Sequence, residues 1–540
     1  MTRPGGRAAR GWAAALLVTI ACTGSPGDPA RERSSPSRDA AGRPASRGCD
    51  DLGRHVRLVR RGRYPGLAPD VLVIPSEPNY VGPRSTPVHS GPWDYLTRVP
   101  LVLYGPGVIR RTGEIPAPAT MADLAPTTAA LVGFEDVPGG DGRVLGDALT
   151  GRRPRVVVTV VWDGGGSNVL RVHASRWPFL RSLMRAGVSY TSMSVGSSPS
   201  VTPPVHATLG TGTFPSRHGI VALNQRNDAG ELEDPLLFLD PSAIRVPTLA
   251  DAYDRSLSNR PVAGMLASSN WHLGMIGHGA QIDGADRDPV VLVDADGAVF
   301  SNADIYSAPV TDDLPLLDRL TTALDRRDGE ADGRWGRTPL DELLAAKGNP
   351  ARVAYEQVLL ERLVAAGGFG DDDVADLLYV NFKAADEAGH MWGMTSPQVG
   401  AVLESQDRAL RRLVAFLDSA VGRRRWALMV TADHGQTPLP EESGGWAIAG
   451  GELERDLGEH FGDPALIDKV VSAGVYVDRE RMTRAGLSLE RIARWTGRYT
   501  AGENRTTAAM PARWEGRESE PLFDAVLAGR RVVGGRCVTD

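Results

Sequence analysis

The feature that most constrains the fold is a set of three short apolar runs. Each run is followed within a few residues by side chains that can bind a metal ion. Runs of this length are typical of buried β-strands. Helical patterns such as 400–418 alternate with them, which is the pattern of a parallel α/β sheet. The runs and the residues behind them are 156–161 with Asp163, 377–381 with Asp386 and His390, and 426–431 with Asp433 and His434. The sequence therefore predicts an α/β fold, a mostly parallel sheet with helices on both faces, with these groups at the carboxyl ends of its strands.

The residue types are those of a two-metal site, because zinc binds carboxylate oxygens and imidazole nitrogens. Thr202, in the segment SVTPPVHATLG, adds a hydroxyl oxygen, and His89, in TPVHSGPWDYL, adds an imidazole. Two ions about 4 Å apart can stabilise both the attacking and the leaving oxygen of an in-line displacement. We predict that Asp163, Thr202, Asp433 and His434 surround one zinc ion and that Asp386, His390 and His89 surround a second.

Several motifs occur together around these residues. They are Thr202 with Pro204 and His206, TG at 211–212, HGI at 218–220, D-x-x-G-H at 386–390 and TADHG at 431–435. With them the chain resembles the alkaline phosphatase superfamily, in its type I phosphodiesterase/nucleotide pyrophosphatase branch, over about residues 56–540. The resemblance implies that Thr202 is a nucleophile that forms a phosphothreonine, and that Asn224 helps to hold the phosphoryl oxygens. The C/S-x-P-x-R motif of sulfatases is absent around Thr202, which disfavours sulfate esters.

The order of the segments departs from the family. The histidine block that normally closes such enzymes, here 56–150 with His89, lies ahead of the core, and after His434 the only remaining histidine is His460. We therefore predict a circularly permuted chain with one catalytic domain over 49–540. Its expected parts are the permuted block 56–150, a metal-binding core at 155–224 and 351–440, a cap insertion at 225–350 and a second insertion at 441–540.

A permuted chain is expected to have neighbouring ends. Cys49 and Cys537 lie near the two ends of the catalytic domain, with no cysteine between them. If the ends are neighbours, these two cysteines can form a disulfide; the alternative is two free, exposed thiols.

The first 22 residues have the form of a signal peptide. Arg3, Arg7 and Arg10 precede an apolar run that ends in TIAC, which resembles a bacterial lipobox with Cys22 as the lipidated residue. Residues 23–48, rich in Ser, Pro, Gly and Arg, are expected to be a disordered linker. We expect an extracytoplasmic protein anchored to the membrane through Cys22, with ordinary signal cleavage as the alternative.

Each motif also has a structural interpretation. A single aspartate after a strand, such as Asp163, is often a turn former, and His206 and His218 are more often structural than metal-binding. His272 and His278, in SNWHLGMIGHGA, stay open between structural and catalytic roles. Asp294 and Asp296, in VDADG, lack a full loop of calcium ligands and favour a turn. The conjunction of several motifs favours a metal-dependent hydrolase.

The resemblance implies cleavage of phosphodiester or pyrophosphate bonds. Monoester phosphatases of the superfamily often carry a K-x-R pair, whereas lysine occurs here only at 347, 383 and 469, which modestly favours diesters. A phosphomonoesterase is the first alternative, and a non-catalytic binding lipoprotein with the same fold is the second. The expected partner is a small phosphate ester, or a lipid or nucleotide that carries one. A net charge of −6 gives no nucleic-acid-binding surface, and the physiological substrate and oligomeric state stay open.

Overall fold

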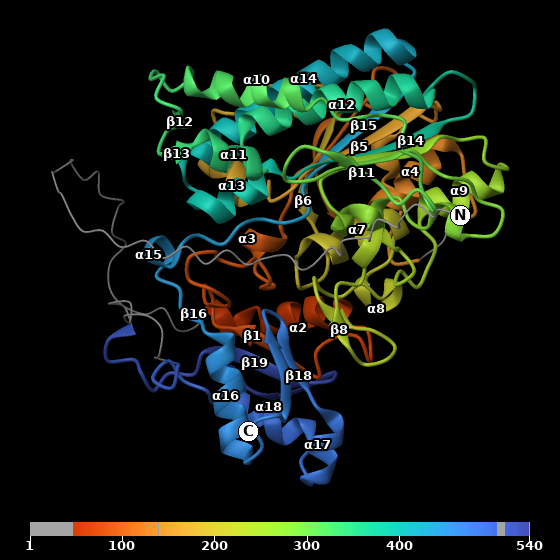
Figure 1. Cartoon of the computed structure of the whole chain (residues 1–540). Helices are drawn as coiled ribbons and strands as arrows, with labels where there is room; N and C mark the ends of the chain where they lie inside the picture. The colour runs from red at the N-terminus through yellow and green to blue at the C-terminus, as the bar shows by residue number, and fades with distance from the viewer. Residues whose placement is uncertain (1–46, 138–139, 505–513, 539–540) are drawn as a thin grey trace, which may run out of the picture. The chain divides into compact units, whose positions relative to one another are not determined.

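A large β-sheet forms the centre of the described chain (Figure 1). The computed structural model describes residues 47–137, 140–504 and 514–538, all of which fall in one compact unit, Ser46–Asp540. Within these residues the sheet has nine strands, in the order β11-β10-β9-β14-β5-β15-β3-β6-β4. Their bounds are β3 (Leu101–Tyr104), β4 (Gly113–Thr120), β5 (Val156–Trp162), β6 (Val188–Ser194), β9 (Ala263–Ala267), β10 (Val290–Val293), β11 (Val299–Phe300), β14 (Asp376–Phe382) and β15 (Trp426–Thr431).

The sheet is mostly parallel, as predicted. β10, β9, β14, β5 and β15 run parallel to one another, whereas β3 pairs antiparallel with β15 and with β6, and β11 pairs antiparallel with β10. The three strands expected from the apolar runs, β14, β5 and β15, lie side by side. Their carboxyl ends therefore share one edge of the sheet, where ligand-bearing loops can meet.

Helices cover both faces of this sheet because its central strands are buried on both sides. Along β5, Val157 and Val161 belong to one apolar cluster, and Val158 and Val160 belong to the other, as the alternation of side chains requires. The first cluster includes helices α4 (Leu124–Val132), α7 (Thr202–Thr211) and α9 (Leu249–Ser256). The second includes α6 (Pro178–Ala186), α10 (Leu314–Asp325), α12 (Pro350–Gly367), α13 (Ala384–Trp392) and α14 (Pro397–Leu417) (Figure 1).

A second sheet joins the two ends of the described chain. Its order is β17-β18-β1-β19-β20, so the early strand β1 (Val71–Pro75) lies between two strands from the last hundred residues. The other strands are β17 (Ile467–Val471), β18 (Gly474–Val477), β19 (Phe523–Ala528) and β20 (Arg531–Gly534). Helices α2 (Leu52–Arg61), α16 (Gly450–Phe461) and α18 (Leu489–Thr496) contribute to the apolar clusters of this sheet. The sheet formed by the segment 441–540 thus includes β1, a strand from the N-terminal block.

Smaller elements connect these layers. Two-stranded pairs join β2 (Tyr80–Val81) to β16 (Ala447–Ile448), β7 (Gln225–Arg226) to β8 (Leu232–Glu233), and β12 (Arg334–Trp335) to β13 (Thr338–Pro339). The short helices are α1 (Arg47–Asp50), α3 (Asp94–Thr97), α5 (Ser167–Val172), α8 (Pro215–His218), α11 (Leu340–Ala345), α15 (Pro440–Ser443), α17 (Arg479–Arg484) and the 3₁₀ helix η4 (Asn270–Met275).

The segment 225–350, expected as a cap, is only partly outside the main sheet. It supplies β9, β10 and β11, which form one edge of that sheet. The apolar runs of these strands are short and lie between Asp- and Gly-rich stretches. This composition is typical of an inserted segment and therefore predicted a cap over the whole range. The fold therefore contains more of this segment in its core than the composition suggests.

Cys49 and Cys537 form a disulfide, with their Cα atoms 5.3 Å apart, so the predicted bridge is confirmed. It joins residues 488 positions apart in sequence and closes nearly the whole described chain into a ring. Because a cross-link restricts the unfolded chain, we expect Cys49→Ser/Cys537→Ser to lose about 2–4 kcal/mol of unfolding free energy. Chemical denaturation with and without reductant measures this. Reductant should destabilise the wild type and leave the double variant unchanged; equal stability of the two proteins without reductant would contradict the prediction.

Among the described residues, no helix combines the length and the apolar character that a membrane crossing requires. The predicted signal peptide, its Cys22 and most of the predicted linker lie outside the described residues.

Candidate metal centre and active site

The main sheet brings three ligand-bearing loops to one edge. Asp163 is the first residue after β5, and Asp433 and His434 follow β15 after one intervening residue. Asp386 and His390 lie on α13, which begins just after β14, and their i,i+4 spacing places them on one helix face. The burial of β5, β14 and β15 on both faces holds these loops in fixed positions. The five residues that follow the apolar runs therefore lie at the same edge of the sheet.

The first group of ligand atoms surrounds His434. Asp163, Asp433 and His434 are fully buried, and each offers one ligand atom within 4.8 Å of the others. The His434 Nε2 atom lies 3.1 Å from Asp433 Oδ2 and 3.6 Å from Asp163 Oδ1. This geometry suits a single cation held by two carboxylates and an imidazole.

The second group surrounds Asp386. His89 Nε2 lies 3.7 Å from Asp386 Oδ1, and His390 Nε2 lies 3.4 Å from the same oxygen. The ring centroids of His89 and His390 are 5.5 Å apart. His434 also approaches this group, at 4.0 Å from Asp386 Oδ1, so it lies between the two sets of ligands.

His89 reaches the centre from a loop that precedes the main-sheet strands in sequence. Its Nδ1 donates to the carbonyl oxygen of Ser200 at 2.8 Å, and the Ser200 hydroxyl donates to the His89 carbonyl at 2.8 Å. With Nδ1 protonated, the Nε2 lone pair faces Asp386, as a metal ligand requires. The His89 ring also stacks on His434, with centroids 3.5 Å apart. Since Ser200 lies two residues before Thr202, these bonds tie the His89 loop to the Thr202 loop.

Thr202 is the first residue of α7, and its hydroxyl faces a buried lysine that the sequence analysis did not single out. The Lys383 Nζ atom lies 3.1 Å from Thr202 Oγ1, 2.8 Å from Asp163 Oδ1 and 2.6 Å from Asp386 Oδ2. Lys383 therefore links the proposed nucleophile to one carboxylate of each group. Its position three residues before Asp386, at the start of α13, was the signal that could have identified it.

A second shell of polar side chains supports Asp163. Its Oδ2 accepts a hydrogen bond from Asn381 Nδ2 at 2.9 Å and lies 3.3 Å from His272 Nε2. His206 lies beside His272, with ring centroids 4.9 Å apart, and both rings are fully buried. His272 thus contacts the centre through Asp163. The sequence alone left the role of His272 open and predicted no role for Asn381.

One glycine of the D-x-x-G-H motif is required by close packing. A Cβ atom at Gly389 would lie 1.7 Å from the Gln436 Oε1 atom. Gln436 Nε2 donates to the carbonyl oxygens of Gly164 at 3.2 Å and Ala385 at 2.9 Å. The amide therefore connects the loops after β5, β14 and β15, and a side chain at Gly389 would displace it.

Charge within the centre is balanced by Lys383 and His434. Burial acts to raise the pKa of Asp163, but the Lys383 ammonium together with His272 and His434 outweighs it and holds that pKa well below its usual range. Burial acts to lower the pKa of His434, but the carboxylates of Asp433, Asp386 and Asp163 together outweigh it and raise the pKa to about 9, so a cation bound to His434 Nε2 would displace a proton. Burial, reinforced by His434, lowers the pKa of His89 well below its usual value, so His89 is neutral, the form that binds metal.

Three buried atoms of the predicted ligands lack a hydrogen bond of good geometry, namely Asp386 Oδ1, Asp433 Oδ2 and His434 Nε2, although the last two lie 3.1 Å from each other. Buried polar atoms are nearly always satisfied in folded proteins, so each such atom needs an explanation. All three belong to predicted metal ligands: Asp386 is grouped with His89 and His434, and Asp433 with Asp163 and His434. The donor set and these unsatisfied atoms fit divalent cations.

Among the described residues, no hydrogen bond or ion pair joins His218, His278 or His460 to a predicted ligand. The Asn224 side chain is exposed, and its contact with the phosphoryl oxygens stays a prediction. His460 packs on Trp495, with ring centroids 5.1 Å apart. His218 contacts the Thr208 hydroxyl at 3.1 Å, and His278 contacts Asp251 at 2.8 Å and the Ile244 carbonyl, so both are structural.

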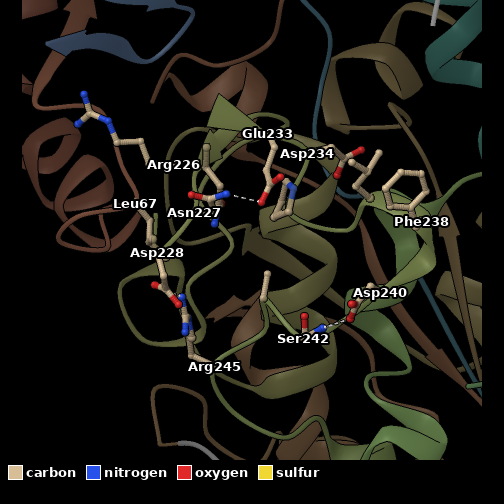
Figure 2. Close-up of a pocket in the computed structure, with 14 residues that line it drawn as sticks. Leu67, Arg226, Asn227, Asp228, Glu233, Asp234, Phe238, Asp240, Ser242 and Arg245 are labelled. Atoms are coloured by element: carbon tan, nitrogen blue, oxygen red, sulfur yellow. Dashed lines mark hydrogen bonds and ion pairs between the residues drawn. The ribbon is translucent and has the colours of Figure 1, made fainter. Parts of the chain in front are cut away.

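A cavity of about 290 Å³ lies in the segment 225–245 (Figure 2). None of the candidate metal ligands lines it. The same segment is anchored near the centre by Asp234, whose Oδ2 accepts hydrogen bonds from Trp271 Nε1 at 3.0 Å and Asn270 Nδ2 at 2.8 Å. The lining includes Leu67, Arg226, Asn227, Asp228, Phe238 and Arg245.

The sequence model of the family described as type I phosphodiesterase / nucleotide pyrophosphatase matches residues 157–477, more than half of the chain. The chain belongs to this family. The match includes Thr202 and all the predicted ligands except His89, which lies ahead of it. The predicted placement in the alkaline phosphatase superfamily, in its type I phosphodiesterase branch, is confirmed.

Relatives of this family member are named alkaline phosphatases. It is 24% identical over 338 residues to alkaline phosphatase PhoD of Zymomonas mobilis, covering 56% of this chain and 58% of that one. It is 25% identical over 170 residues to alkaline phosphatase PafA of Elizabethkingia meningoseptica, covering 30% and 31% of the two chains. The chain thus spans little more than half the length of the first relative. A crystal structure of wild-type PafA shares the fold, with a TM-score of 0.50 at 16% identity over 71% of this chain and 84% of that one.

Proposed function

We propose that this family member is a metal-dependent phosphohydrolase that cleaves phosphodiester or pyrophosphate bonds through a phosphothreonine at Thr202. The observation that carries the proposal is the convergence of Thr202 with two groups of metal ligands at one edge of the sheet. Three buried ligand atoms without a hydrogen bond of good geometry strengthen it, because cations would satisfy them.

The proposed cations are two zinc ions. Asp163, Thr202, Asp433 and His434 would hold one, and the ligand atoms of Asp163, Asp433 and His434 lie within 4.8 Å of one another. Asp386, His390 and His89 would hold the other, with His390 Nε2 3.4 Å and His89 Nε2 3.7 Å from Asp386 Oδ1. Such ions stabilise charge on phosphoryl oxygens and favour ionised hydroxyl and water nucleophiles. The neutral state of His89 and its oriented Nε2 support its assignment as a ligand.

The protein's own groups position the nucleophile. Thr202 begins α7, where the helix dipole favours an anionic substrate, and two prolines shape the first helical turn. In the proposed reaction the Thr202 oxygen bonds to phosphorus while the bond from phosphorus to the leaving oxygen breaks. Water then attacks the phosphothreonine, restores the hydroxyl and releases the phosphoryl product. Lys383, hydrogen-bonded to Thr202, holds the hydroxyl toward the carboxylates of both groups.

A specific observation favours phosphomonoester hydrolysis as the second candidate. Lys383 places a buried ammonium group 3.1 Å from Thr202 Oγ1. A monoester carries one more negative charge than a diester, and a fixed cation beside the nucleophile would favour that extra charge. The absence of a K-x-R pair and the family match support the diester as the first candidate.

Two aryl substrates distinguish these candidates. We expect kcat/KM for bis-p-nitrophenyl phosphate to exceed that for p-nitrophenyl phosphate by at least about tenfold, a difference of about 1.4 kcal/mol in transition-state stabilisation. The control is Lys383→Met, which should reduce monoester turnover more than diester turnover. A clear preference for the monoester would favour the second candidate, and no hydrolysis of either by zinc-loaded protein would favour the non-catalytic alternative.

We further propose that the chain is a circular permutation of the family order and is exported as a lipoprotein through Cys22. The permutation is supported by β3 and His89, which precede the core strands in sequence yet lie beside them, and by β1, which pairs with β19. Export is supported by the disulfide, since disulfides persist in oxidising compartments. A small phosphate ester, or a lipid or nucleotide that carries one, is the proposed substrate.

A further inference from the structure

A second group of acidic side chains lies on the 225–350 segment, apart from the metal centre. Asp254, on α9, and Asp286 and Asp288, in the loop before β10, each offer a carboxylate oxygen within 4.8 Å of the others. Asp254 is 2% exposed and Asp288 is 5% exposed, whereas Asp286 is open to solvent. Two of the three carboxylates are therefore removed from water at short mutual distance.

The structure does not balance these charges. Asp254 Oδ1 is buried without a hydrogen-bond partner, and within the described residues no lysine or arginine forms an ion pair with Asp254, Asp286 or Asp288. Burial, reinforced by Asp286 and Asp251, raises the pKa of Asp254 to about 7. Burial, reinforced by Asp254, raises the pKa of Asp288 well above its usual range. A buried carboxylate without a partner is costly and is normally paired or bound to a metal.

Asn259 connects the two segments that carry these carboxylates. The Asn259 backbone N–H donates to the Asp254 carbonyl at 3.0 Å, and Asn259 Nδ2 donates to the Gly284 carbonyl at 3.0 Å. These bonds hold the Asn259 side chain between the end of α9 and the loop that carries Asp286. Its Oδ1 atom is buried and has no hydrogen-bond partner.

We propose that Asp254, Asp286 and Asp288 form a binding site for a divalent hard cation of the calcium type. The donors are all oxygens, which calcium and magnesium prefer and which differ from the nitrogen and oxygen set of the metal centre. The exposed Asp286 leaves room for water ligands. Calcium, which accepts flexible geometry and six to eight oxygens, fits this arrangement better than magnesium.

A cation bound to Asp254, Asp286 and Asp288 would stabilise one edge of the main sheet. Asp288 lies two residues before β10, and its carbonyl oxygen accepts the Ser307 N–H at 2.9 Å. The cation would therefore connect α9 to the strand next to β9. The VDADG motif, by contrast, is a turn, since Asp294 Oδ1 accepts the Ala298 N–H at 2.9 Å.

The test titrates calcium chloride into the zinc-loaded, full-length protein. We expect calorimetric binding and a rise in Tm of about 2–4 °C at saturating calcium, because a ligand that binds only the native state stabilises it. Asp254→Asn should abolish the calcium-dependent rise. Asp286→Asn, an exposed substitution that leaves the buried pair intact, should weaken calcium binding at least about tenfold. Asp283→Asn, in the same loop and outside the group, is the matched control and should bind calcium as the wild type does.

Two results would contradict the proposed calcium site. One is a wild-type protein whose Tm and calorimetric signal do not respond to calcium. The other is a calcium response that persists unchanged in Asp254→Asn and Asp286→Asn, which would place the binding elsewhere. If Asp254→Asn raises the Tm in the absence of calcium and the wild type shows no calcium response, the buried carboxyls share a proton instead of a cation.

Discussion

Thr202→Ala should reduce kcat by at least about 1,000-fold, because the variant lacks the oxygen that is proposed to attack phosphorus. The substitution removes one of seven proposed metal ligands, and the other six come from side chains that it does not touch. We therefore expect zinc content by mass spectrometry and the Tm to change little. Loss of turnover with metal retained separates a chemical role from a structural one.

Thr202→Ser is the matched control for this prediction. It keeps the hydroxyl and its hydrogen bond to Lys383 while it removes a buried methyl group. Measurable activity in the serine variant, with a phosphoserine trapped by acid quench, is expected. An alanine variant that retains more than a few per cent of wild-type kcat would contradict the covalent mechanism.

His89→Ala should lower activity by about 100-fold or more and reduce the zinc content toward one ion for each chain. The imidazole faces Asp386 and is held by Ser200, so its loss removes a ligand and loosens the loop before Thr202. Metal analysis and kcat/KM on the preferred substrate measure the two effects. Added zinc should recover part of the activity, because Asp386 and His390 remain.

His460→Ala is the control, since the sequence leaves His460 as the other histidine that could complete the site. It packs on Trp495 in the second sheet's layer, and its loss should leave zinc content and kcat unchanged. Equal activity losses in the two histidine variants would contradict the assignment of His89.

The parts of the fold that the sequence predicted are those with strong local signals. The runs before Asp163, Asp386 and Asp433 are apolar without alternation because β5, β14 and β15 are buried on both faces. A parallel arrangement then places the following residues at one edge, so the convergence of the ligands could be predicted without a structure.

The remaining parts depend on contacts that are distant in sequence. β9 and β10 are short and flanked by Asp and Gly, and their place at the edge of the main sheet depends on pairing with β14. In the sequence, Lys383 is an ordinary residue at the start of a helix. Only in the folded chain does it lie between Asp163 and Asp386. Asp254, Asp286 and Asp288 are separated by up to 34 positions and form no recognisable motif.

The roles of the histidines likewise divide into those that local sequence predicts and those that depend on contacts distant in sequence. His206 and His218 were expected to be structural; His218 hydrogen-bonds Thr208, whereas His206 lies with His272 behind Asp163. The role of His272 could not be predicted because η4 approaches Asp163 from a segment that appeared to be an insertion.

The most direct test of the account is anomalous X-ray diffraction at the zinc edge from crystals of the zinc-loaded protein. We predict two zinc peaks, one bound by Asp386, His390 and His89, and the other by Asp163, Asp433, His434 and the Thr202 oxygen. A zinc ion bound by His460, with His89 outside coordination distance of both ions, would contradict it.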